Sequence, residues 1–436
     1  MQAMKIFFGM LLALSLPTQI AVAGDPIFES NAQFEASQKA RGEGLAAFRA
    51  GDAPAALVKL EEALALRPNN TLLLGYVAFL TVETGDLARA AEAATQYAAT
   101  GQALGRGIQG KLAEKLPADI WAPIKAAFDA NITAKGEATL HYVIPTDIAL
   151  VEGIAAAPGG RLFVSSVVSG GLYVLEDDGP RQIMSAADHN MGSFFGITHD
   201  PLHGSLWATY GRVDQTPVHN PGHNKSEGTT GIAEFDAMTG ALRHNYVLDG
   251  STADHQIADL LITHDHTVYA SDAAGKAVYK VAGNTLAKAF NLPYATSPQG
   301  LVETKDGILI LADYGRGLWR LDRSKGTASL LGVPQGINLV GIDGLTVHGD
   351  HLLAVQNGVN PHRIMEITLS DDYKSVKNAT VIAQSLPNFD EPTLGVSTPS
   401  GYVFVAGSQW PKYTPGGAVK ESATIKPTHI LKLTIE

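Results

Sequence analysis

The chain has 436 residues, of which 45% are hydrophobic and 17% charged, and it contains no cysteine. The lack of cysteine excludes a disulfide scaffold, a zinc ribbon, an iron–sulfur protein, a cysteine nucleophile and a cysteine-anchored lipoprotein. Acidic residues outnumber basic ones by 43 to 32, which disfavours nucleic-acid binding because phosphate contacts need basic surface. A chain of this length predicts two or three domains, or a repeat array with an appendage.

Residues 1–23 have the pattern of a secretory signal peptide. Lys5 precedes an apolar run that extends to Leu16, and Ala21 to Ala23 supply small residues for cleavage before Gly24. The run is too short to span a bilayer, and no later segment reaches about 18 uninterrupted apolar residues. We therefore expect a periplasmic or secreted protein without a membrane span. The alternative is a buried N-terminal helix.

Residues 24–135 are predicted to form a helical repeat domain. The pair Gly51-Asp52 recurs as Gly85-Asp86, a period of 34 residues. Between them, apolar residues at helical spacing mark one buried helix face. The stretch resembles the tetratricopeptide repeat, which has this period.

Two such repeats fit, at about 38–71 and 72–105. A further helical segment over 109–130 is expected to cover the open end of the array, as terminal repeats require. The resemblance leaves two roles open, which are docking of a protein or peptide partner and simple packing.

Residues 136–436 are predicted to form an all-β domain of six repeated units. Each unit begins with a similar triplet, and the middle positions are separated by 43, 63, 41, 44 and 48 residues. Two further strand-like runs follow each triplet. Six units of about 44 residues predict a six-bladed β-propeller. The triplets begin at Glu152, Phe195, Ala258, Gln299, Asp343 and Glu391.

The two ends of this domain predict how the ring closes. The last unit ends at Leu433, and a strand over Thr139–Ile144 precedes the first triplet. We expect this strand to complete the last blade, which removes an exposed sheet edge. The 63-residue interval holds a long polar loop at Gly211–Gly231.

The propeller resembles the group formed by senescence marker protein, gluconolactonase and luciferin-regenerating enzyme, and more distantly the paraoxonases and diisopropyl fluorophosphatase. The resemblance covers about 300 residues. It rests on short motifs that are common among propellers: Val151-Glu152-Gly153-Ile154, Gln299-Gly300-Leu301-Val302, Leu311-Ala312-Asp313-Tyr314-Gly315 and Ile342-Asp343-Gly344-Leu345.

The resemblance implies a divalent cation, calcium first, at one mouth of the central channel. The family takes its ligands from the first triplet positions of blades one, three, four and five. Glu152 and Asp343 match that pattern, and Gln299 replaces an Asn. Ala258 offers no ligand, so Asp259 or a water would have to fill its place. Calcium accepts such oxygen donors, and crowded carboxylates need a cation or protons.

Other candidate residues surround the same channel mouth. His255 lies on the loop before the third triplet, and a neutral imidazole can act as a general base. The candidate substrate pocket comprises the second triplet's first residue and residues on the loops after each second strand. These are Phe195, Asp313, Tyr314, Asn357 and Trp410.

The sequence supports two functions. The first is a metal-dependent hydrolase acting on a small-molecule lactone or ester, with Glu152, Asp343 and His255 as catalytic candidates. The second is a non-catalytic binding or assembly protein, which the Ala258 departure favours. A nucleophile-elbow serine and a Walker loop are both missing from the sequence.

Overall fold

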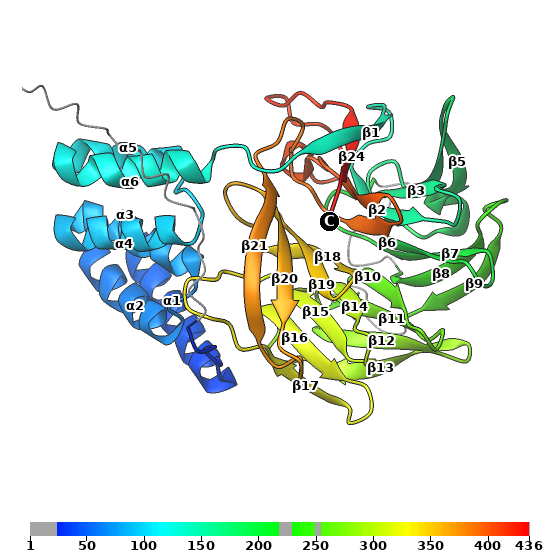
Figure 1. The fold of residues 1–436 in the computed structure, drawn as a ribbon, viewed down its shortest axis with the longest axis horizontal. Coiled ribbons are helices and arrows are strands. Elements are labelled where there is room, and N and C mark those ends of the chain that lie inside the picture. The colour runs from blue at the N-terminus through cyan, green and yellow to red at the C-terminus, as the bar shows by residue number, and fades with distance from the viewer. Residues whose placement is uncertain (1–23, 218–228, 249–253, 436) are drawn as a thin grey trace, which may run out of the picture.

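The computed structural model describes residues 24–217, 229–248 and 254–435. A region of six helices comes first, and six four-stranded sheets follow within the described part of the chain. Figure 1 shows the helices, in blue to cyan, at one side of the propeller. The predicted fold class is confirmed. The predicted signal peptide, residues 1–23, lies outside the described residues, as does much of the predicted long loop.

The helices pack in neighbouring pairs. Helices α1 and α2, and then α3 and α4, contact each other, while α5 and α6 pack on α3 and α4. The repeated Gly-Asp pairs explain two helix starts, because the carboxylates of Asp52 and Asp86 accept the backbone N–H of residues three positions later. The helices are α1 (Asn31–Arg49), α2 (Ala53–Leu66), α3 (Thr71–Thr84), α4 (Leu87–Ala99), α5 (Arg106–Lys115) and α6 (Ala118–Asn131).

The helical segment expected over 109–130 consists of the two helices α5 and α6. Pro117 separates them, and Leu116 before it is extended, with ψ of 143°. A residue that precedes proline is pushed out of the helical region by the proline ring. The two helices still cover the end of the array. The likeness to the tetratricopeptide repeat itself stays a prediction.

Each propeller blade is a four-stranded antiparallel sheet. The strands of blades one to three are β2 (Val151–Ala156), β3 (Leu162–Ser166), β4 (Gly171–Glu176), β5 (Gly179–Ser185), β6 (Ser193–Asp200), β7 (Ser205–Gly211), β8 (Gly231–Asp236), β9 (Leu242–Val247), β10 (Ile257–Ile262), β11 (Val268–Asp272), β12 (Ala277–Ala282) and β13 (Thr285–Asn291). Those of blades four to six are β14 (Pro298–Glu303), β15 (Leu309–Asp313), β16 (Gly317–Asp322), β17 (Thr327–Leu330), β18 (Ile342–His348), β19 (His351–Gln356), β20 (Arg363–Leu369), β21 (Val376–Gln384), β22 (Gly395–Thr398), β23 (Gly401–Val405), β24 (Thr428–Leu433) and β1 (Ala138–Ile144).

The ring closes as the sequence predicts. Strand β1 pairs antiparallel with β24 as the outer strand of blade six. The innermost strands β2, β6, β10, β14, β18 and β22 contact one another in order, and β22 returns to β2. At this joint the Thr393 hydroxyl donates to the backbone oxygen of Glu152 at 2.9 Å.

Glycine in the middle of a triplet lets neighbouring innermost strands approach closely. A Cβ on Gly300 would lie 2.6 Å from the backbone nitrogen of Leu345 and 2.7 Å from the backbone oxygen of Asp343. The same close approach occurs at Gly153, Gly196 and Gly344. The repeated glycine is therefore a packing requirement of the ring.

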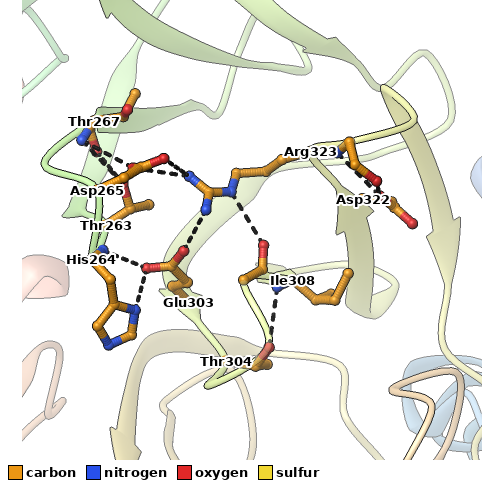
Figure 2. Close-up of polar contacts among 11 residues, drawn as sticks. Thr263, His264, Asp265, Thr267, Glu303, Thr304, Ile308, Asp322 and Arg323 are labelled. Carbon is orange, nitrogen blue, oxygen red and sulfur yellow. Dashed lines mark hydrogen bonds and ion pairs between the residues drawn. The ribbon is translucent and has the colours of Figure 1, made fainter.

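A polar network joins blades three and four at the end of the channel opposite the triplets (Figure 2). Arg323 lies between two acids, 3.2 Å from Asp265 and 2.7 Å from Glu303. Glu303 also accepts the backbone N–H of His264 at 2.7 Å. No helix in the described part of the chain is long and apolar enough to cross a membrane.

Candidate active site

The first triplet positions converge on one cavity of about 280 Å³ at the channel mouth. Every innermost strand, or the residues just before it, contributes to the wall. Loops that follow the second strands of blades four to six supply the rest. The lining residues are Glu152, Phe195, Gly196, Gln256, Ala258, Asp259, Ser297, Gln299, Tyr314, Asp343, Asn357, Glu391, Leu394 and Trp410.

All four predicted ligand residues, Glu152, Asp259, Gln299 and Asp343, line this cavity. Asp259 stands at the middle triplet position, where four other blades have glycine. Its Oδ1 accepts the backbone N–H of Leu260 at 2.8 Å. Blade three thus brings a carboxylate to the cavity from the residue beside Ala258.

Burial raises the pKa of all four carboxyl groups in the cavity. The pKa of Asp259 rises to about 7 and that of Asp343 to about 6. The pKa of Glu391 rises to about 7, first through burial and then through the charges of Asp343 and Asp390. Burial and the neighbouring Asp343 also raise the pKa of Glu152. No Lys, Arg or His of the described residues lines the cavity, although the charge of Lys412 lowers the pKa of Glu391 in part. Protons or a bound cation would neutralise the crowded acids.

Side chains on the loops hold two of the acids in place. The indole Nε1 of Trp410 donates to Oε2 of Glu152 at 2.8 Å. Asn357 donates to Oδ2 of Asp343 at 2.7 Å and accepts from the Tyr314 hydroxyl at 3.1 Å. These bonds link the aromatic wall of the cavity to its acids.

Two predicted site residues lie outside the cavity lining. His255 bonds through Nδ1 to Oδ2 of the buried Asp272 at 2.6 Å, although its neighbour Gln256 does line the cavity. The carboxylate of Asp313 accepts the backbone N–H of Thr296 at 2.8 Å and faces local backbone. Both aspartates end a second strand and fix the loop before the innermost strand, because an Asp side chain readily accepts backbone N–H groups.

The sequence reasoning missed Glu391 as a site residue. Its Oε2 is buried and has no hydrogen-bond partner among the described residues. Its backbone has a positive φ of 67°, which is rare outside glycine and is found at functional sites. The signal was available, since Glu391 begins the sixth triplet.

Comparison with solved structures finds other propellers. Similar structures include the pyrroloquinoline-quinone-bound aldose sugar dehydrogenase of Streptomyces coelicolor, with 14% identity, a TM-score of 0.47 and coverage of 70% of this chain and 99% of that one. Virginiamycin B lyase of Staphylococcus aureus has 14% identity, a TM-score of 0.45 and coverage of 69% and 100%. A protein assigned as a gluconolactonase has 14% identity, a TM-score of 0.46 and coverage of 69% and 98%.

These likenesses concern the propeller architecture alone. No protein-family profile matches the chain, and no curated protein matches it.

The donor types in the cavity fit a hard cation. The acids offer carboxylate oxygens, and Gln299 donates through Nε2 to Ser297 at 2.9 Å, which leaves its carbonyl oxygen to other partners. Calcium prefers such oxygens. As placed, no three His, Asp or Glu side chains within the described ranges stand close enough to share one metal ion. Binding a cation therefore requires these side chains to rotate toward a common point.

Proposed function

We propose that the protein is an exported hydrolase that opens a lactone or cleaves an ester in the channel-mouth cavity, with a divalent cation, calcium first. The observation that carries this proposal is a set of four carboxylates in one cavity, of which Glu152 is buried and Asp259, Asp343 and Glu391 are partly buried. Among the described residues, the cavity lining has no basic side chain. The pattern of residues 1–23 supports export.

Glu152, Asp343, Gln299 and Asp259 would hold the cation. When bound, it supplies a positive charge that polarises a carbonyl and stabilises the oxyanion. Trp410 and Asn357 orient the carboxylates of Glu152 and Asp343 through the hydrogen bonds described above. The proposal therefore uses the predicted ligand set.

Glu391 is the best-placed proton acceptor. Its Oε2 is buried without a partner, and a carboxylate with a pKa of about 7 suits proton transfer near neutral pH. As water attacks the carbonyl carbon, its proton passes to Glu391 and the ring C–O bond breaks. The leaving alkoxide then takes that proton, which yields a hydroxy acid. His255 has no part in this step because it lies outside the cavity lining.

The aromatic side chains set the substrate size. Phe195, Tyr314 and Trp410 line the cavity together with Leu394. A cavity of about 280 Å³ lies near the small end of the range for ligand pockets. The site therefore suits a compact lactone or ester.

Hydrolysis of a lactone and ester panel tests the proposal. We expect calcium chelation, Glu152→Gln and Asp343→Asn each to lower kcat/KM by roughly a hundredfold or more. Asp350→Asn is the matched control, since the side chain of Asp350 is 76% exposed. A purified protein that binds no calcium and hydrolyses none of the panel would refute the proposal.

A second function, docking of an apolar peptide by the helical region, is favoured by a separate groove. The groove measures about 490 Å³ and is lined mostly by apolar side chains of α1, α3 and α5, including Phe48, Leu72, Tyr76, Phe79 and Ile108. Capture of partners from periplasmic extract by the full chain tests this function. Leu72→Glu should abolish a specific capture, and Val58→Glu, on an exposed position of α2, should not.

A further inference from the structure

We propose that the helical region positions the wall of the candidate active site, and that Arg363 and Arg316 are the positioning residues. The inference rests on the proposed function for its catalytic meaning. Its structural basis is a set of contacts between the helices and two propeller loops. These loops carry Asn357 and Tyr314, which line the cavity.

The first loop joins β19 to β20 and is held by the end of α4. Asn360 and Ala103 form a reciprocal pair at 2.8 Å. The backbone N–H of Ala103 donates to the backbone oxygen of Asn360, and the side-chain amide of Asn360 donates to the backbone oxygen of Ala103. Beside them, Arg363 donates to the backbone oxygens of Thr100 and Gly101 at 3.2 and 3.3 Å. Thr100 is the residue that caps the C-terminus of α4, and Gly101 follows it, so Arg363 lies near the end of a helix, where the dipole stabilises a cation.

Arg363 is 1% exposed, and its guanidinium donates hydrogen bonds to uncharged acceptors. Its Nε donates to Gln356 at 2.6 Å, and Gln356 in turn donates to two backbone oxygens of the loop before β18. A buried guanidinium is costly unless its donors are satisfied. Here the helical region supplies two of the acceptors, so that docking of α4 and ordering of this loop are coupled.

The second loop joins β15 to β16 and is held by the segment before α1. Glu29 pairs with Arg67 at 2.7 Å and with Arg316 at 2.6 Å. The guanidinium of Arg316 also lies 4.2 Å from the ring centroid of Phe34 on α1. Arg67 donates to the backbone oxygen of Gly315 at 3.2 Å. Tyr314, which lines the cavity, is the residue just before Gly315.

The two loops meet at Asn357. Its amide lies between the Tyr314 hydroxyl and the Asp343 carboxylate. Movement of either loop away from the helices would therefore displace the group that orients Asp343. Docking of the helical region therefore determines, through Asn357, how the carboxylate of Asp343 is oriented.

Hydrogen–deuterium exchange of the full-length protein tests the inference without a substrate. Arg363→Met removes the donors at nearly constant volume, and Asn360→Ala is a gentler variant for the same loop. We expect exchange over 357–362 to rise roughly tenfold in both. Arg323→Met, at the opposite channel mouth, is the control and should leave 357–362 unchanged.

The calcium dissociation constant, measured with calcium alone, is the second readout. We expect this dissociation constant to rise about tenfold in Arg363→Met and Asn360→Ala and to stay unchanged in Arg323→Met. A general loss of stability would not produce this difference between the loop variants and the control. Unchanged exchange over 357–362 in both loop variants would overturn the inference. If the parent protein binds calcium, unchanged calcium affinity in Arg363→Met and Asn360→Ala would also overturn the inference. If the parent binds no calcium and hydrolyses nothing, the proposed function fails, and exchange alone decides the positioning role.

Discussion

The side-chain amide of Asn357 donates a hydrogen bond to Oδ2 of Asp343 at 2.7 Å. This bond favours the charged carboxylate and opposes the effect of burial, which raises the pKa of Asp343 to about 6. The same amide Nδ2 also lies 3.0 Å from the backbone oxygen of Pro392, just before β22. One side chain therefore links blades five and six at the cavity.

Replacing Asn357 is expected to change the pH dependence of hydrolysis. In Asn357→Leu the charged form of Asp343 loses a donor, so its pKa rises and ionisation moves to higher pH. We expect the acidic limb of the kcat/KM profile to shift upward by roughly half to one pH unit. Asn378→Leu, on an exposed position of β21, is the control. An unshifted limb in Asn357→Leu would contradict the assigned role.

Stability without a divalent cation is expected to fall as pH rises. Asp259 and Glu391 have pKa values of about 7 in the folded protein, above their ordinary 3.8 and 4.5. The folded state therefore holds more protons than the unfolded state between about pH 4.5 and 7, and each group costs up to about 1.4 kcal/mol per pH unit across that window. Thermal melts from pH 5 to 8 in chelator should show the decline.

Two comparisons isolate these groups. Asp259→Asn should make the fall of Tm with rising pH less steep. Comparing the variant with the parent at each pH cancels the contributions of other groups, such as His362, whose pKa is lowered by burial. Calcium should raise Tm more at pH 8 than at pH 5, because cation binding competes with protons and stabilises the folded state. A larger calcium shift at pH 5 would contradict the assignment.

The close approach of the innermost strands makes Gly300→Ala a sharp test of the ring. The added Cβ would meet backbone of blade five at 2.6 and 2.7 Å, so neighbouring strands must move apart. We expect a loss of about 1–3 kcal/mol in the free energy of unfolding. The matched control is Gly110→Ala in α5, where a Cβ meets nothing within 4 Å and should stabilise the helix by up to about 1 kcal/mol. Denaturant titration measures both.

We expect Arg323, in the network of Figure 2, to stabilise the fold more than Lys305, whose ion pair with Asp350 is exposed. Arg323→Met leaves the carboxylate of Glu303, whose side chain is 3% exposed, without its guanidinium partner. We expect a loss of about 2–3 kcal/mol. Lys305→Met is the control, because the Lys305 and Asp350 side chains are 69% and 76% exposed and such pairs contribute at most about 1 kcal/mol. Similar losses in the two variants would contradict the assignment.

Local sequence patterns were sufficient to predict the propeller. The triplet period placed all six innermost strands, and the position of Thr139–Ile144 predicted how blade six is completed. They predicted helical structure over 109–130 without the break at Pro117, where a proline separates α5 from α6. They also misplaced Asp313, since an Asp that accepts local backbone N–H groups and an Asp that faces a cavity look alike in sequence.

The sequence by itself determined the repeat period, the ring closure and the presence of acids at the triplet positions, because each follows from short local patterns and their spacing along the chain. Only the tertiary structure decided that Oε2 of Glu391 is buried without a hydrogen-bond partner among the described residues and that His255 lies outside the cavity lining. It also decided that Arg363 and Arg316 connect the helices to the loops of Asn357 and Tyr314. The contacts of Arg363 and Arg316 with the helical region join residues more than 200 positions apart, and the packing of one domain on the other fixes them.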